Sequence, residues 1–107
     1  MRPAPSRWPT CTGEFGRTPK INGGQGRDHW LRGWSLAVAG GGFRGGFVHG
    51  QTTESGGDVE KDPVSVPDFM ATLLHAIGIQ PEKEYHDDLG RPNKLVDDGN
   101  IVHELLT

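Results

Sequence analysis

The chain has 107 residues, which is enough for one domain at most. Its formal net charge of −3 gives no general attraction to nucleic acid or to an anionic membrane, so we expect neither as a partner. The single cysteine cannot form an internal disulfide, and the sequence has no apolar run long enough to cross a membrane.

The hydrophobic content is low for a folded chain. Leu, Ile, Val and Phe make up about a fifth of the residues, close to the roughly 20% level at which disorder becomes common. The 17 glycines add backbone entropy that folding must remove, and they bring no side chain to bury. Two apolar segments are nevertheless clearly patterned. The composition therefore predicts part of a folded α/β domain that lacks its neighbours.

Residues 1–11 contain Pro3, Pro5 and Pro9. Proline cannot donate a hydrogen bond to a sheet, so this segment is not expected to form a central strand. It also lacks the apolar stretch of an export signal, and the location of the protein in the cell stays unknown. We interpret residues 1–11 as a disordered leader that is foreign to the domain, and residues 12–107 as the domain.

The middle of the chain alternates between glycine-rich and apolar stretches. Residues 12–33 hold six glycines and are expected to form a loop. Residues 34–39 form a short apolar run that ends at three glycines, which favours a buried strand. Residues 47–50 are expected to form a second short strand, and residues 51–61 a polar segment with a turn at 56–58.

Residues 65–78 carry the best helix signal. Pro67 suits the first turn of a helix, Asp68 suits its positive end, and Gly78 is suited to end it. We expect a charged connecting loop at 82–98 and a final helical turn at 101–106. One apolar face of the helix is predicted from residues at three- and four-residue spacings: Phe69, Met70, Leu73, Leu74 and Ile77.

Glu14 and Arg17 lie in a short glycine-bounded segment, Gly13 to Arg17. A carboxylate between glycines can approach a metal ion closely, and an arginine can bind an oxyanion through two parallel hydrogen bonds. The alternative is a turn with a surface ion pair worth at most about 1 kcal/mol. The residues alone leave both interpretations open.

Asp28 and His29 offer a carboxylate and an imidazole side by side. Neighbours in an extended chain point to opposite sides, so only one of them is expected to reach a given ion. The other would act by orienting that ligand. The alternative is a loop histidine that is hydrogen-bonded to Asp28 or to solvent. The other histidines are not expected to bind metal: His49, His75, His86 and His103.

Residues 40–46 read Gly-Gly-Gly-Phe-Arg-Gly-Gly. They match neither a phosphate-binding Walker loop nor a dinucleotide-binding glycine fingerprint. Their Phe-Arg-Gly-Gly-Phe core is similar to one unit of an RNA-binding RGG segment, but one unit in an acidic chain is a weak signal. A chain reversal after the strand at 34–39 explains the glycines more simply.

Several of these motifs together resemble a known family. In order and spacing they resemble the C-terminal part of the sulfatase-like DUF1501 family, a family of the alkaline phosphatase superfamily that is frequent in planctomycetes. The resemblance covers about residues 12–107. The segments that carry it are 12–19, 26–30, 39–42, 66–79, 90–92 and 101–106.

The resemblance implies an α/β fold, in which this chain is the C-terminal fragment of an alkaline-phosphatase-like, largely parallel sheet flanked by helices. It implies two divalent cations (Zn, Mn, Mg or Ca) and a sulfate or phosphate ester substrate. Glu14 would replace the aspartate ligand of the family's metal motif, Phe15 stands where a histidine ligand is usual, and His29 resembles a later histidine ligand. Asp68 and Thr72 are expected to be structural.

The family's nucleophile and its remaining acidic ligands lie upstream of the part that this chain resembles. The first hypothesis is therefore a C-terminal fragment of a metal-dependent sulfatase- or phosphatase-like hydrolase that is inactive alone. Its candidate residues are Arg17, which would stabilise charge in the transition state, and the metal ligands Glu14, Asp28 and His29. The second hypothesis is a non-catalytic fragment that associates with another chain carrying the missing half. Full-length relatives are typically exported.

Overall fold

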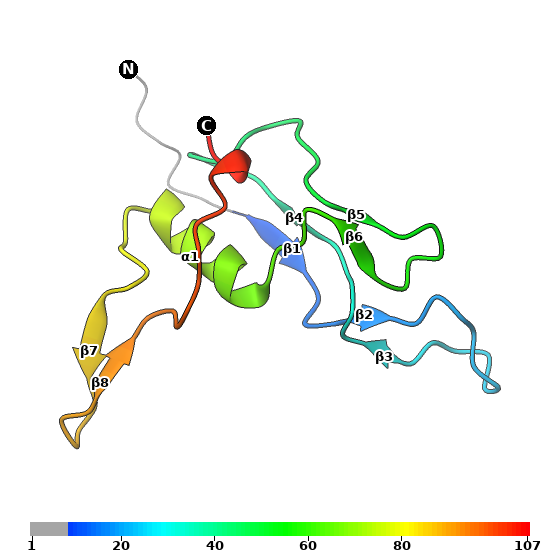
Figure 1. Ribbon diagram of the computed structural model, residues 1–107, viewed down its shortest axis with the longest axis horizontal. Coiled ribbons are helices and arrows are strands. Elements are labelled where there is room, and N and C mark those ends of the chain that lie inside the picture. The colour runs from blue at the N-terminus through cyan, green and yellow to red at the C-terminus, as the bar shows by residue number, and fades with distance from the viewer. Residues whose placement is uncertain (1–8) are drawn as a thin grey trace.

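The computed structural model describes residues 9–107, so the predicted disorder of residues 1–8 lies outside the described range. The fold is mixed α and β, as predicted. The described residues form four two-stranded antiparallel ribbons and one helix, with one ribbon on one side of the helix and three on the other (Figure 1). The elements are β1 (Thr10–Thr12) with β4 (Leu36–Val38), β2 (Gly16–Arg17) with β3 (His29–Trp30), β5 (Gln51–Thr52) with β6 (Val59–Lys61), β7 (Glu84–His86) with β8 (Pro92–Lys94), α1 (Val66–Ala76) and the 3₁₀ turn η1 (His103–Leu105).

No larger sheet with helices on its faces forms within residues 9–107. The reason is the length of the strands, which have two or three residues each. The β2–β3 and β7–β8 ribbons extend to opposite sides of the molecule (Figure 1). The radius of gyration is 16.8 Å, against about 13 Å for a compact domain of 100 residues. The described chain is therefore flat and open.

The predicted strand at 34–39 forms as the shorter β4, which pairs with β1 through Thr12 and Leu36. Its predicted burial is wrong, because Leu36 and Ala37 are exposed and Val38 is half-buried. Thr10 and Cys11, assigned to the leader on sequence, also belong to this ribbon. The second strand predicted at 47–50 is wrong, because the extended residues begin at β5. Gly46 and Gly50 have φ of +66° and +83°, which interrupt an extended chain on both sides of 47–49.

The loops expected at 12–33 and 82–98 each contain a hairpin, β2–β3 and β7–β8. Both expectations were therefore wrong in part. The strands of these hairpins are short and mostly polar, so they carry no alternation of apolar side chains that would reveal them. The turn expected at 56–58 lies in the β5–β6 connection, where the backbone N–H of Thr53 donates to the carbonyl of Asp58 at 2.9 Å.

The predicted helix is confirmed as α1. Ser65 caps it by accepting a hydrogen bond from the backbone N–H of Asp68 at 3.1 Å. At its end, Gly78 adopts a φ of +89° and its N–H donates to the carbonyl of His75. The N–H of Ile79 donates to the carbonyl of Leu74, so the helix ends in a Schellman motif. No described helix is long and apolar enough to span a membrane.

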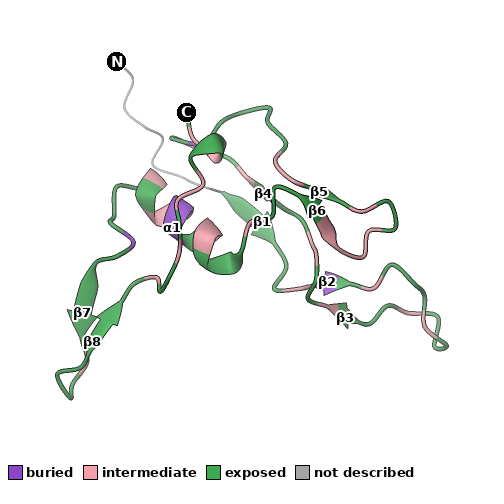
Figure 2. Ribbon diagram, viewed as in Figure 1, coloured by how far each residue is buried: buried purple, intermediate pink, exposed green. Residues whose placement is uncertain are grey.

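The apolar face predicted for α1 is buried only in part, with Phe69, Leu73 and Leu74 half-buried. Met70 and Ile77 each remain 39% exposed, whereas Ala71 and Thr72 are fully buried. The buried face contacts the C-terminal segment, residues 100–107, through hydrogen bonds rather than through a broad apolar surface. Within residues 9–107 the buried hydrophobic residues are only Phe43 and Ala71, and most of the ribbon is exposed or half-buried (Figure 2).

Phe43 connects the glycine-rich turn with the C-terminal segment. Its N–H donates to the carbonyl of Gly40 at 3.2 Å, which confirms the predicted chain reversal. It forms a bridge with Leu106, and the N–H of Arg44 donates to the carbonyl of Leu105 at 2.8 Å. The predicted helical turn at 101–106 is confirmed as η1.

Candidate functional site

The β2–β3 hairpin brings together the residues that the sequence singled out. In its register Arg17 lies opposite His29, and Gly16 lies opposite Trp30. Glu14 lies two positions before the hairpin, and Asp28 is the last residue before β3. A side chain on Gly16 would clash with the carbonyl oxygen of Gly33, so glycine is needed for this close packing.

The His29 imidazole stacks on the ring of Phe15. Its ring centroid lies 3.9 Å from that of Phe15, with an interplanar angle of 30°. The guanidinium carbon of Arg17 lies 5.3 Å from the centroid of the same Phe15 ring. No described residue hydrogen-bonds to the imidazole nitrogens, which stay available as ligands. Phe15 thus supports the His29 ring from one side.

The loop between β2 and β3, residues 18–28, is closed by side-chain to backbone hydrogen bonds. Asn22 Oδ1 accepts from the backbone N–H groups of Gly24 at 2.9 Å and Gly26 at 3.0 Å. Asn22 Nδ2 donates to Asp28 Oδ1 at 3.1 Å. Asparagine before glycines favours such turns, so this part of the loop had a signal in the sequence that went unused.

Two arginines fasten the base of the same loop. Arg27 Nη1 donates to the carbonyls of Thr18 at 2.7 Å and Pro19 at 2.8 Å. Arg17 Nη1 donates to the carbonyl of Arg27 at 3.1 Å. One donor of Arg17 therefore holds the loop, while this exposed guanidinium keeps further donors for an anionic ligand. Nothing in the sequence pattern indicated the role of Arg27.

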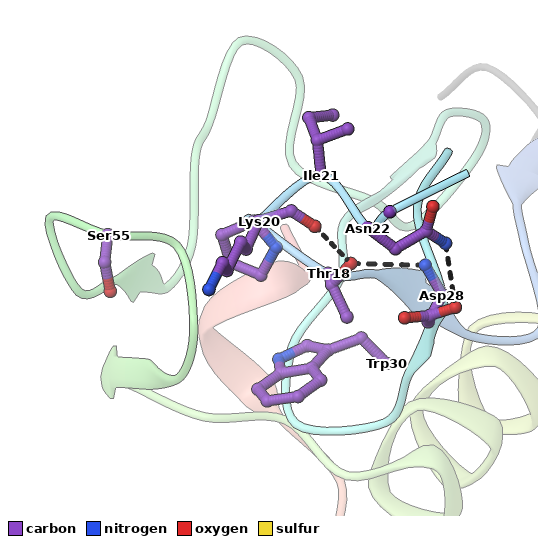
Figure 3. Close-up of a pocket in the computed structure, with 9 residues that line it drawn as sticks. Thr18, Lys20, Ile21, Asn22, Asp28, Trp30 and Ser55 are labelled. Carbon is purple, nitrogen blue, oxygen red and sulfur yellow. Dashed lines mark hydrogen bonds between the residues drawn. The ribbon is translucent and has the colours of Figure 1, made fainter. Parts of the chain in front are cut away.

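Asp28 lies on the other side of the hairpin from His29. Together with Trp30, Thr18 and Lys20 it lines an open hollow of about 590 Å³, which His29 does not line (Figure 3). Alternation of side chains along an extended chain explains this arrangement. Asp28 and His29 therefore do not face one common ion. This agrees with the expectation that only one of two adjacent residues reaches a given ion.

Trp30 joins the hairpin to the neighbouring ribbon. Its indole Nε1 donates to the carbonyl of Gly57, in the β5–β6 connection, at 2.6 Å. Arg32 and Asp58 add an exposed ion pair of 2.6 Å between the same two parts of the chain. The β2–β3 hairpin is thus anchored at one end by Trp30, and the sequence pattern did not indicate this role.

The described donors fit part of a metal site and not a complete one. Glu14 is exposed and adjoins Phe15, the residue on which the His29 ring stacks. Imidazole and carboxylate together suit a divalent ion such as Zn²⁺ or Mn²⁺. Within residues 9–107, however, no three His, Cys, Asp or Glu side chains gather in a group that could hold a metal.

The comparisons with known proteins add one finding. A family model described as "Protein of unknown function (DUF1501)" matches residues 10–106. This range includes the hairpin, helix α1 and almost all of the C-terminal segment. No curated protein and no solved structure matches the chain. The description of the family names no reaction.

Proposed function

This chain belongs to the DUF1501 family over residues 10–106, and we propose that it supplies part of the active site of a metal-dependent sulfatase- or phosphatase-like hydrolase. The observation that carries the proposal is the His29 imidazole, which is fixed by Phe15 while its nitrogens have no described partner. The likeness of residues 12–19 and 26–30 to sulfatase-like members of the alkaline phosphatase superfamily supplies the reaction class.

In this proposal each residue of the hairpin has one task. His29 and Glu14 bind a divalent cation, which when present stabilises negative charge on the oxygens of a phosphoryl or sulfuryl group. Arg17 donates to the same anionic group with the donors that do not hold Arg27. Asp28, on the other face, keeps the loop closed through Asn22 and so positions His29.

Two protein donors are fewer than a catalytic metal requires, since such ions have three or more protein ligands and an open position. We therefore place the remaining ligands and the nucleophile on another polypeptide segment, with the sheet of the family fold completed by it. The consequence is that residues 9–107 alone bind a metal weakly and turn over aryl sulfate or aryl phosphate very slowly.

Paramagnetic NMR with Mn²⁺ tests the metal site directly. We expect Mn²⁺ to broaden the amide signals of Glu14 and His29 before those of β7–β8, and a chelator to restore them. His29→Ala should weaken this binding at least about tenfold, because even residues that only orient a ligand contribute 10- to 100-fold. His86→Ala, which removes an exposed histidine from β7, is the matched control.

Two results would contradict the proposal. If Mn²⁺ broadens the same signals equally in His29→Ala, the metal site does not lie on the hairpin. Robust metal-dependent turnover by this chain alone, abolished by His29→Ala, would instead show that the site is already complete.

The exposed apolar surface favours a second candidate, a non-catalytic subunit or fragment that associates with another polypeptide. Met70 in α1 and Ile77, the C-cap residue of the helix, lie seven positions apart, which places them on one side of the helix, and each is 39% exposed. Leu36 in β4 is exposed to the same extent. Exposed apolar surface of this kind marks protein contact sites in soluble proteins.

A further inference from the structure

The C-terminal segment, residues 100–107, follows one face of helix α1. Asp68 Oδ1 accepts a hydrogen bond from the N–H of Asn100 at 2.8 Å. One turn later, Thr72 Oγ1 accepts from the N–H of Val102 at 2.8 Å. The helix and the C-terminal segment therefore run in the same direction, with successive contacts one turn of the helix apart.

The next position along this face brings two histidines together. His75 lies in the last turn of α1, and His103 begins η1. Their ring centroids are 6.0 Å apart, with the rings at 77° to each other. Both side chains are exposed, and within residues 9–107 neither imidazole has a hydrogen-bond partner. The first two contacts are thus hydrogen bonds, whereas the third is a pair of free ligands.

We infer, against the expectation from the sequence, that His75 and His103 form a two-imidazole site for a divalent transition-metal ion such as Zn²⁺ or Ni²⁺, which fastens the C-terminal segment to helix α1. Metal–nitrogen bonds of about 2.0–2.1 Å place two imidazole centroids about 4.5–5 Å apart on one ion, about 1 Å closer than in this structure. Since both side chains are exposed, small rotations bring them to this geometry without disturbing packed residues.

The two imidazoles favour particular ions, and two further features affect how an ion is held. Imidazole prefers Zn²⁺, Ni²⁺ and Cu²⁺ over the hard ions Mg²⁺ and Ca²⁺, which bind oxygen. A cation is also favoured at the C-terminal end of a helix, where His75 lies. Water would complete the coordination, because no third His, Cys, Asp or Glu joins this pair among the described residues.

Calorimetric titration with Ni²⁺ tests the pair in a His29→Ala background, where the hairpin of the proposed hydrolase site cannot contribute. His75→Ala and His103→Ala should each weaken the affinity at least about tenfold. The double variant should be no weaker than either single variant, since one imidazole alone cannot chelate. His49→Ala and His86→Ala are controls of the same type, and each should leave the affinity unchanged.

Thermal unfolding supplies an independent measurement. Ni²⁺ should raise the Tm of the His29→Ala protein by binding the folded state, and Mg²⁺ should not. Each of the two alanine variants should lose this rise while keeping its far-UV circular dichroism spectrum in the absence of metal. An unchanged affinity in either variant, or two losses that add in the double variant, would overturn the inference. Because it rests on other residues, it stands or falls separately from the hydrolase proposal.

Discussion

At the scale of single residues, Asp68 and Thr72 in helix α1 have structural roles. Thr72 is fully buried and donates its hydroxyl to the carbonyl of Asp68 at 2.7 Å while it accepts from Val102. The resemblance predicted a structural role for Asp68 and Thr72, and both fix the C-terminal segment. Their partners could not be predicted, because the contacts join positions about thirty residues apart that share no local pattern.

Thr72→Val tests this role with a side chain of nearly the same shape. It leaves the Val102 N–H without an acceptor in a part-buried place, so we expect a loss of about 1–3 kcal/mol in the free energy of unfolding. Urea denaturation should show a lower midpoint with an unchanged slope. Thr52→Val, at an exposed strand position, should change the value by less than about 0.5 kcal/mol. Equal effects at the two positions would remove Thr72 from its proposed role.

Arg17 shows what residue type and spacing alone leave open. Its position directly after Gly16 allowed an oxyanion-binding group or a surface partner of Glu14. The structure pairs its guanidinium with the carbonyl of Arg27 and places it near the Phe15 ring. A backbone carbonyl ten residues away has no signature in the sequence, so this contact was not predictable. The neighbours Asp28 and His29 were predictable in one respect, since alternation alone places them on opposite sides.

At the scale of elements, predictability followed the strength of the local signal. Helix α1 was predicted because Pro67, Asp68 and Gly78 act locally, and all three lie where the prediction placed them. The hairpins β2–β3 and β7–β8 were missed because their strands are short, and their stability comes from turns. In the second hairpin the turn depends on one carboxylate, Asp87, which accepts from the N–H groups of Leu89 and Arg91, both at 2.9 Å.

The stability of the β7–β8 turn should fall at acid pH. The Arg91 backbone N–H, opposed in part by desolvation and helped by the Arg91 side chain and the Leu89 N–H, holds the pKa of Asp87 below its usual 3.8. Because the folded pKa is lowered, the stabilisation is present above pH 3.8 and is lost as the pH falls through the lowered value. The amide shifts of Leu89 and Arg91 should report this titration in NMR spectra.

Asp87→Asn provides the control for that titration. It keeps a side-chain oxygen acceptor but cannot ionise, so the amide shifts of Leu89 and Arg91 should become flat across the acid range. A midpoint at or above pH 3.8 in the unmodified chain would show that the folded turn does not favour the carboxylate.

At the scale of the whole molecule, the local signals do not add up to a closed core. The sequence predicted a strand and an amphipathic helix, and both form, but they do not bury their apolar sides against each other. Phe43 is 7% exposed and anchors the C-terminal segment, while Leu31, Val48 and Leu89 are 74%, 87% and 77% exposed. The content of apolar residues, about a fifth of the chain, is too small to cover a sheet and a helix at once.

The uncovered side of α1 should therefore behave as accessible apolar surface in solution. We expect the chain to raise the fluorescence of the apolar dye ANS, and the double variant Met70→Ser with Ile77→Ser to lower that signal. The free energy of unfolding should fall by no more than about 1 kcal/mol, because both side chains are already partly in water. Leu89→Ser, at the β7–β8 turn, is the control and should leave most of the signal.

A polypeptide that covers this side of α1 should compete with the dye and stabilise the chain, since it would remove the same side chains from water. The double serine variant should then lose both the competition and the stabilisation, whereas the Leu89→Ser control should keep them. A chain that binds no dye, or one whose dye signal ignores both serines, would mean that Met70 and Ile77 form no such surface. In that case the apolar side of the helix would give no reason to expect a second polypeptide.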